Sequence, residues 1–115
     1  MDYLKTNQLK QELSLYEVQR IRSKYPNKIP LLVIETKNMK IDRQKFLVDL
    51  SMKYAELLLV FRRRIKDLNP AESIYMFVGK NNSLVPLHKT VQETLDDVME
   101  DDYIKITLAK ENTFG

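Results

Sequence analysis

Hydrophobic residues in the N-terminal quarter of the chain recur with the period of an α-helix. Leu9, Leu13 and Tyr16 are spaced four and three residues apart, which places them on one helical face. The stretch "SLYE" at 14–17 has the spacing of a capping box, a pattern that starts a helix. Proline disfavours a helical conformation in the residue before it. We therefore predict a short first helix and a longer second helix that ends before Pro26.

The next two apolar stretches predict a β-hairpin. The stretch "KIPLLVIE" at 28–35 is rich in aliphatic and β-branched residues, which favour strands. A polar connection joins it to "KFLVDL" at 45–50, which has the length of a second strand. The first strand is apolar on both faces, with Ile29, Leu31 and Val33 on one and Pro30, Leu32 and Ile34 on the other. Each face must therefore be covered by another element or bind a partner.

The most regular helical pattern lies between residues 53 and 65. Its apolar stripe contains Tyr54, Leu57, Leu58, Phe61 and Ile65. Ser51 precedes the segment and is the candidate N-cap, because a serine hydroxyl can accept a bond from a free backbone N–H. The pattern predicts a long core helix.

Shorter elements are expected in the second half of the chain. "NPAE" at 69–72 predicts a turn, and the β-branched and aromatic residues at 73–78 predict a strand. After a turn at "GKNN", the stretch "SLVP" is short enough for an edge strand. "TVQE" at 90–93 is a second capping box, which opens a helix toward Met99. Residues 103–109 then alternate apolar and polar, as a half-buried strand requires.

The order of these elements is that of the ubiquitin-like β-grasp. Without the N-terminal helices, the chain runs through a hairpin, a long helix, two strands, a short helix and a final strand. We predict an α+β domain built on a four-stranded mixed sheet, with two extra N-terminal helices. The expected parts are a helical extension packed on the domain at 1–25, the β-grasp domain at 26–110 and a flexible C-terminal tail at 111–115.

Composition narrows the chemistry that the chain can perform. Its 115 residues suit one domain, and the absence of cysteine excludes a disulfide, a thiolate nucleophile and a cysteine zinc site. The single histidine, His88, cannot form a histidine-rich metal site, and no nucleophile elbow accompanies it. Two glycines, Gly79 and Gly115, are too few for a phosphate-binding glycine loop. We expect a protein that is not an enzyme and holds no metal or cofactor.

Charge and hydropathy bear on membranes and nucleic acids. The net charge is +3, with basic residues gathered at 20–28, 37–45 and 62–66 and acidic residues at 96–102. The arginine run lies on a predicted helix, where successive side chains point about 100 degrees apart, and no aromatic-rich binding sheet accompanies it. No signal peptide opens the chain, and its longest apolar run, at 56–61, is too short to span a bilayer. We expect a cytosolic protein without a nucleic-acid partner.

Five stretches of the chain match one known family in order and spacing. They are "IRSKYPNKIPLLV" at 21–33, "KFLV" at 45–48, "RRRI" at 62–65, "IYMFV" at 74–78 and "ENTFG" at 111–115. They resemble the autophagy ubiquitin-like modifiers, the family that includes microtubule-associated protein light chain three and GABA-receptor-associated protein. The similarity covers nearly the whole chain from Glu17 onward. The chain departs from the family pattern at Asp49 and Ala55, at Ala109 and Lys110, and before the last strand, where the usual "DGF" reads Asp101, Asp102, Tyr103.

The resemblance implies a modifier that is joined to a lipid. Gly115 is expected to be conjugated to the amine of phosphatidylethanolamine by activating and conjugating enzymes, with Phe114 as the residue held just before it. A cysteine protease processes and deconjugates members of this family. The implied role is in autophagosome formation, and the implied location is the cytoplasm and, after lipidation, the autophagosomal membrane.

The resemblance also implies a docking surface for cargo receptors and adaptors, whose motifs place an aliphatic residue three positions after an aromatic one. Such a peptide adds as a strand to the edge of the second strand. The residues that match the aromatic pocket are Glu17, Ile21, Pro30, Leu32, Lys45, Leu47 and Tyr103. Those that match the aliphatic pocket are Phe46, Val48, Met52, Leu57 and Val60. The cations expected to meet acidic residues beside the motif are Lys28, Arg43, Lys45 and Arg64.

Two alternatives remain open from the sequence alone. The N-terminal helices can cover the second apolar face of residues 28–35, instead of leaving it to a peptide. The chain can also be a ubiquitin-like interaction module that is never attached to another molecule. In that case Gly115 is an ordinary chain end.

Overall fold

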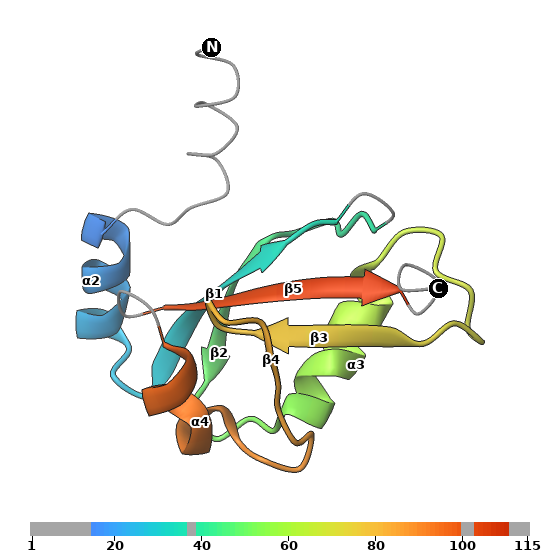
Figure 1. Ribbon diagram of the computed structural model, residues 1–115. Helices are drawn as coiled ribbons and strands as arrows, with labels where there is room; N and C mark the ends of the chain where they lie inside the picture. The colour runs from blue at the N-terminus through green and yellow to red at the C-terminus, as the bar shows by residue number, and fades with distance from the viewer. Residues whose placement is uncertain (1–14, 37–38, 100–102, 111–115) are drawn as a thin grey trace.

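The computed structural model describes residues 15–36, 39–99 and 103–110. The predicted first helix, and the tail with Phe114 and Gly115, lie outside these residues. The described elements are α2 (Leu15–Lys24), β1 (Lys28–Ile34), β2 (Lys45–Asp49), α3 (Tyr54–Arg64), β3 (Ile74–Val78), β4 (Ser83–Leu84), α4 (Val91–Val98) and β5 (Ile104–Lys110). Figure 1 shows the sheet with α3 across one face and α2 beside one end of β1. Within the described part, the predicted order of helices and strands is confirmed.

The strands form one mixed sheet in the order β2-β1-β5-β3-β4. β1 pairs with β2 antiparallel and with β5 parallel, and β3 pairs antiparallel with both β5 and β4. The β-grasp fold is confirmed, and all five predicted strand segments join the sheet, so the description of the sheet as four-stranded is wrong. The short edge strand expected at "SLVP" is β4, because a turn with Gly79 at φ +80° and Asn82 at φ 50° brings Ser83 and Leu84 back against β3. The two edges of the described sheet are β2 and β4.

Helix α3 begins later than expected, whereas α4 begins as predicted. The prediction of Ser51 as the N-cap is wrong, because the cap is Lys53, whose N–H donates to Glu56 Oε1 at 2.9 Å. A β-bridge to Thr90 holds Lys53 extended, so the helix can start only after it.

At the start of α4, the predicted capping box is present. Thr90 N–H donates to Glu93 Oε1 at 3.0 Å and Glu93 N–H donates to Thr90 Oγ1 at 3.3 Å. Two hydrogen bonds from Thr90 lower the pKa of the Glu93 carboxyl. The backbone N–H has the larger effect and the hydroxyl the smaller one.

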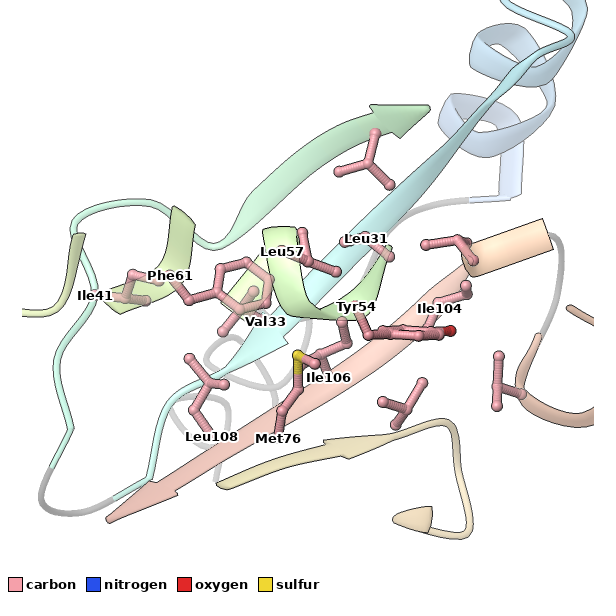
Figure 2. Packing of buried hydrophobic residues seen from close by; sticks show 14 of the residues in the cluster. Leu31, Val33, Ile41, Tyr54, Leu57, Phe61, Met76, Ile104, Ile106 and Leu108 are labelled. Atoms are coloured by element: carbon pink, nitrogen blue, oxygen red, sulfur yellow. The ribbon is translucent and has the colours of Figure 1, made fainter. Parts of the chain in front are cut away.

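The main core lies between α3 and the sheet. Tyr54, Leu57 and Phe61 are completely buried, which confirms the predicted apolar stripe of α3. Figure 2 shows their side chains directed toward the apolar residues of β1 and β5. A hydrogen bond of 2.6 Å between Tyr54 Oη and Thr94 Oγ1 ties α3 to α4 inside this core. Burial raises the pKa of the Tyr54 phenol above its ordinary value.

A smaller apolar cluster lies on the opposite face of the sheet. Val18 of α2 packs there with Leu32 of β1 and with Tyr103, and each of the three is at most 6% exposed. Successive side chains of a strand point to opposite faces. Because Leu31 belongs to the core under α3, Leu32 faces the other way. Helix α2 therefore covers part of the second apolar face of β1.

The described residues form neither a membrane span nor a metal site. Within residues 15–36, 39–99 and 103–110, no helix combines the length and apolar character needed to cross a bilayer. The same ranges contain no group of three His, Cys, Asp or Glu side chains placed to hold a metal ion. His88 is exposed in the connection between β4 and α4.

Candidate functional site

The outer edge of β2 is the candidate docking edge. Two backbone bonds determine which groups of β2 point outward: Val33 N–H donates to Gln44 O at 2.8 Å, and Leu50 N–H donates to Asn27 O at 3.0 Å. In an antiparallel pair, bonded and non-bonded residue pairs alternate. Phe46 and Val48 therefore bond to β1. The backbone groups of the residues between and beside them point away from the sheet.

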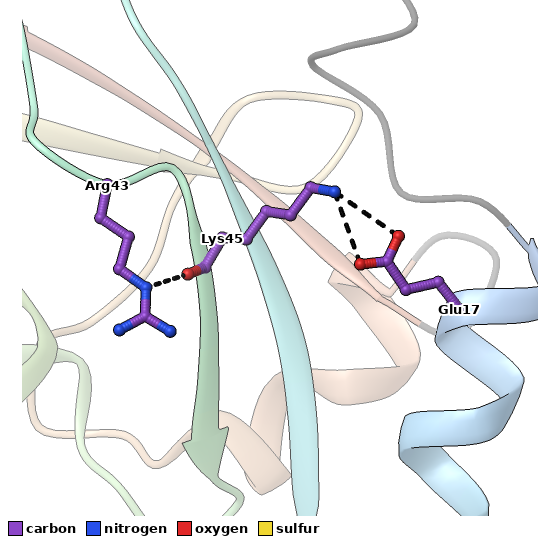
Figure 3. Close-up of polar contacts among 3 residues, drawn as sticks. All are labelled: Glu17, Arg43 and Lys45. Atoms are coloured by element: carbon purple, nitrogen blue, oxygen red, sulfur yellow. Dashed lines mark hydrogen bonds and ion pairs between the residues drawn. The ribbon is translucent and has the colours of Figure 1, made fainter.

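The three outward-pointing residues of β2 are Lys45, Leu47 and Asp49. Two of their carbonyls are already occupied, because Arg43 Nε donates to Lys45 O at 2.8 Å and Met52 N–H donates to Asp49 O at 3.1 Å. Figure 3 shows the first of these bonds. The N–H and C=O of Leu47 are thus the central pair that an added strand can use.

The predicted aliphatic set is split between core and surface. Leu57 is completely buried and Val48 is buried, so both belong to the main core beneath the site. Phe46, Met52 and Val60 are half-buried and present surface. The Phe46 ring meets Phe61 edge to face at a centroid distance of 5.4 Å.

Two arginines rest on the outer side of Phe46. The guanidinium carbons of Arg43 and Arg64 lie 5.5 Å and 5.6 Å from the ring centroid. Beside them, an open depression of about 460 Å³ is lined by Asp42, Val60, Arg63 and Arg64. This arrangement offers an apolar contact bordered by cations.

The predicted aromatic set lies on the side of β2 that faces α2. Its deepest members, Leu32 and Tyr103, are buried beneath α2, and Pro30 is buried as well. Ile21, Leu47, Glu17 and Lys45 remain half-buried or exposed around them. At Leu32 and Tyr103, helix α2 therefore covers the second apolar face of β1, which is one of the two alternatives left open by the sequence. A peptide can reach these two side chains only if α2 moves.

Most of the predicted docking cations already have carboxylate partners. Lys28 Nζ lies 3.3 Å from Asp49 Oδ1, and Arg64 Nη1 lies 3.3 Å from Asp42 Oδ1. Lys45 reaches across β1 to Glu17 of α2 at 3.4 Å, as Figure 3 shows. Such exposed pairs contribute only about 0–1 kcal/mol each, so an acidic peptide can replace the internal carboxylates.

Sequence reasoning missed the two carboxylates Asp42 and Asp49. Asp49 was noted as a departure from the family pattern, but its partner depends on the hairpin register, which sets Lys28 opposite it. Asp42 meets Arg64 because Asp42 N–H donates to the Arg64 carbonyl at 3.2 Å. No sequence spacing signals a contact across 22 residues.

Comparison with known proteins agrees with this geometry. The family described as "Autophagy protein Atg8 ubiquitin like" matches residues 14–115. Autophagy-related protein 8e of Arabidopsis thaliana is 35% identical over 103 residues, which are 86% of this chain and 82% of that protein. Microtubule-associated protein 1 light chain 3 gamma of Homo sapiens is 36% identical over 104 residues, which are 86% and 69% of the two chains. Plasmodium falciparum Atg8, solved in complex with a Plasmodium falciparum Atg3 peptide, superposes with a TM-score of 0.71 at 28% identity, covering 88% of this chain and 94% of that one.

The family match and the fold support each other. The matched residues include every described helix and strand, from α2 to β5. The strand order with its central parallel pair is the predicted β-grasp. The chain therefore belongs to the Atg8 family of ubiquitin-like autophagy proteins.

Proposed function

We propose that this Atg8 family member is a modifier whose Gly115 is conjugated to phosphatidylethanolamine. It recruits cargo receptors and adaptors by adding their aromatic-x-x-aliphatic motifs to β2. It acts in autophagosome formation, in the cytoplasm before lipidation and on the autophagosomal membrane afterwards. Its enzymatic partners are activating and conjugating enzymes and a processing cysteine protease.

The open edge of β2 is the observation that carries the docking half of the proposal. An added strand places residues three positions apart on opposite faces, because side chains alternate. On β2 itself, Phe46 faces the core under α3 and Leu47 faces the side of α2. An aromatic residue on the α2 side and an aliphatic residue on the α3 side therefore match the two predicted pockets. The three-residue spacing of the motif fits this two-sided edge.

The attachment half rests on family membership and on the chemistry of the chain end. The terminal carboxyl has to pass through narrow enzyme channels. Glycine suits the last position because it has no Cβ to obstruct a close approach of the backbone. A relative with 28% identity binds a peptide of Atg3. A phospholipid supplies two acyl chains, and two are what stable membrane anchoring requires. No membrane-spanning helix is needed for such an anchor.

Mass spectrometry of the membrane-associated protein tests the attachment. Amide formation between the Gly115 carboxyl and the lipid amine releases water. We therefore expect the mass of the chain to increase by that of phosphatidylethanolamine less one water molecule, with the added mass on the C-terminal peptide. Protein from the soluble fraction is the control and should carry an unmodified carboxyl. An unmodified C-terminus in all membrane-associated protein would contradict the attachment.

Backbone methylation of a bound peptide tests the docking edge. An N-methyl group on the peptide amide that faces Leu47 removes one hydrogen bond, and we expect it to weaken binding by at least about tenfold, because a buried carbonyl is then left without a donor. The matched control carries the methyl group on the neighbouring amide, which points away from β2. Isothermal titration calorimetry measures both. Equal affinities of the two peptides would exclude strand addition.

A further inference from the structure

A second open depression lies at the C-terminal end of α3 and shares only Arg63 with the depression beside Phe46. Its volume is about 360 Å³, and the residues that line it are Leu59, Arg62, Arg63, Leu68 and Pro70. We call these five residues the tail-side patch. Leu59 projects from the outer face of α3 and is 56% exposed. The patch thus combines an exposed aliphatic side chain with two guanidinium groups.

The cations of the patch lack carboxylate partners among the described residues. Arg62 donates to two backbone carbonyls, Glu72 O at 2.9 Å and Pro70 O at 3.2 Å, which position its guanidinium without neutralising it. Arg63 is exposed and forms no ion pair with any described residue. Arg64, by contrast, is paired with Asp42. The unbalanced positive charge is therefore on the face of α3 that carries Leu59.

The patch lies where the chain leaves the domain toward Gly115. β5 ends at Lys110, whose Nζ lies 3.9 Å from Glu72 Oε2, and the carbonyl of Glu72 is the one that holds Arg62. Figure 1 shows the end of β5 beside the end of α3 and the connection that follows it. The five residues after Lys110 span at most about 18 Å when fully extended. A membrane attached to Gly115 is therefore within reach of this end of the molecule.

We propose that the tail-side patch docks on an anionic phospholipid surface when Gly115 is attached to a lipid; this inference rests on the proposed attachment. Guanidinium groups bind phosphate oxygens with charge-assisted, frequently bidentate hydrogen bonds. Basic residues near an anionic leaflet are attracted to it, and exposed aliphatic side chains bury themselves at the boundary between headgroups and acyl chains. Arg62 and Arg63 supply the first contact and Leu59 the second. The domain then sits on the bilayer with the β2 edge left for peptides.

The test uses the absence of cysteine and tryptophan from the chain. A cysteine appended after Gly115 is the single site for coupling to maleimide-bearing phosphatidylethanolamine in preformed vesicles. In that background, Leu59→Trp supplies a single fluorophore in the patch. The matched control is Leu87→Trp, which is also an exposed aliphatic position, 44% accessible, but lies near the start of α3, where Ala55 N–H donates to the Leu87 carbonyl.

We expect brominated acyl chains to quench the Leu59→Trp variant and to leave the Leu87→Trp variant almost unchanged. The vesicles contain phosphatidylserine, and quenching should fall in vesicles of phosphatidylcholine alone or at high salt. Adding Arg63→Glu to the Leu59→Trp variant should reduce the docking equilibrium by about fivefold per unit of charge. Because Arg63 is exposed, this variant should keep its urea unfolding midpoint, which reports that the fold is intact.

Equal quenching of the two tryptophan variants, or none of either, would overturn the proposal. If Arg63→Glu left quenching unchanged but lowered the yield of enzymatic conjugation, the patch would belong to an acidic protein partner instead. The chemical coupling does not depend on any enzyme. An unmodified C-terminus in cells would therefore count against the attachment, whereas equal quenching on vesicles would count against the patch alone.

Discussion

Replacement of Gly115 with alanine is expected to abolish the membrane-associated form of the protein while leaving peptide binding unchanged. The added Cβ lies next to the reacting carboxyl, where enzyme channels must approach the backbone closely. The docking edge lies on β2 and shares no residue with the tail. Membrane fractionation and intact-mass spectrometry measure the first effect, and peptide titration measures the second.

A matched substitution in the same tail separates the chemistry of glycine from a general effect of mutation. Asn112→Ala also changes a tail residue, but it leaves the terminal Phe-Gly pair unchanged. We expect it to support near-normal attachment. If the Gly115→Ala protein remained on membranes as the unaltered protein does, the chain would be the alternative, a ubiquitin-like interaction module that is never conjugated.

Replacement of Gly79 with alanine is expected to lower the free energy of unfolding by about 2–4 kcal/mol, because backbone strain and crowding add. Gly79 has φ +80°, in the region that residues with a Cβ rarely adopt. A Cβ built there would lie 3.0 Å from the carbonyl oxygen and 3.1 Å from the Cα of Val98. These are backbone atoms at the end of α4, so the helix itself would have to move. Urea denaturation measures the change.

The control for Gly79→Ala is Asp67→Ala. Asp67 also has a positive φ, 57°, but it is exposed. An alanine there has a conformational cost of about 1–2 kcal/mol, part of which aspartate already has, and the substitution adds no new atom because aspartate already has a Cβ. Equal destabilisation by the two substitutions would show that the close approach of Gly79 to α4 does not contribute to the free energy of unfolding.

Local sequence signals predicted most of the described elements. Three patterns are confirmed: the apolar stripe of α3, the aliphatic run of β1 and the alternation of β5. Each depends only on which side chains of a single segment face the core. The Thr90 capping box is confirmed for the same reason, because its partner Glu93 is only three residues away. The prediction of Ser51 as the cap was wrong because the start of α3 depends on a bridge between Lys53 and Thr90. That bridge joins residues 37 positions apart.

The candidate docking site could be predicted only as a set of residues. The resemblance named the aliphatic and aromatic sets, and the structure brings them to the two faces of β2. Their accessibility could not be predicted, because it depends on what packs over them. Leu57 lies under Phe46 and its neighbours in the main core, and Leu32 and Tyr103 lie under α2.

The amino-acid sequence by itself determined the elements, the β-grasp order and the family of this protein, because periodicity, caps and recurring stretches are properties of neighbouring residues. Only the tertiary structure decided that β2 is an edge, which carbonyls of that edge Arg43 and Met52 already occupy, and which cations are paired. It also linked Arg62, which has no carboxylate partner among the described residues, through Glu72 to the end of β5 at Lys110. These features depend on contacts between segments far apart in the chain, and such contacts arise only when the strands pair and the helices pack on them.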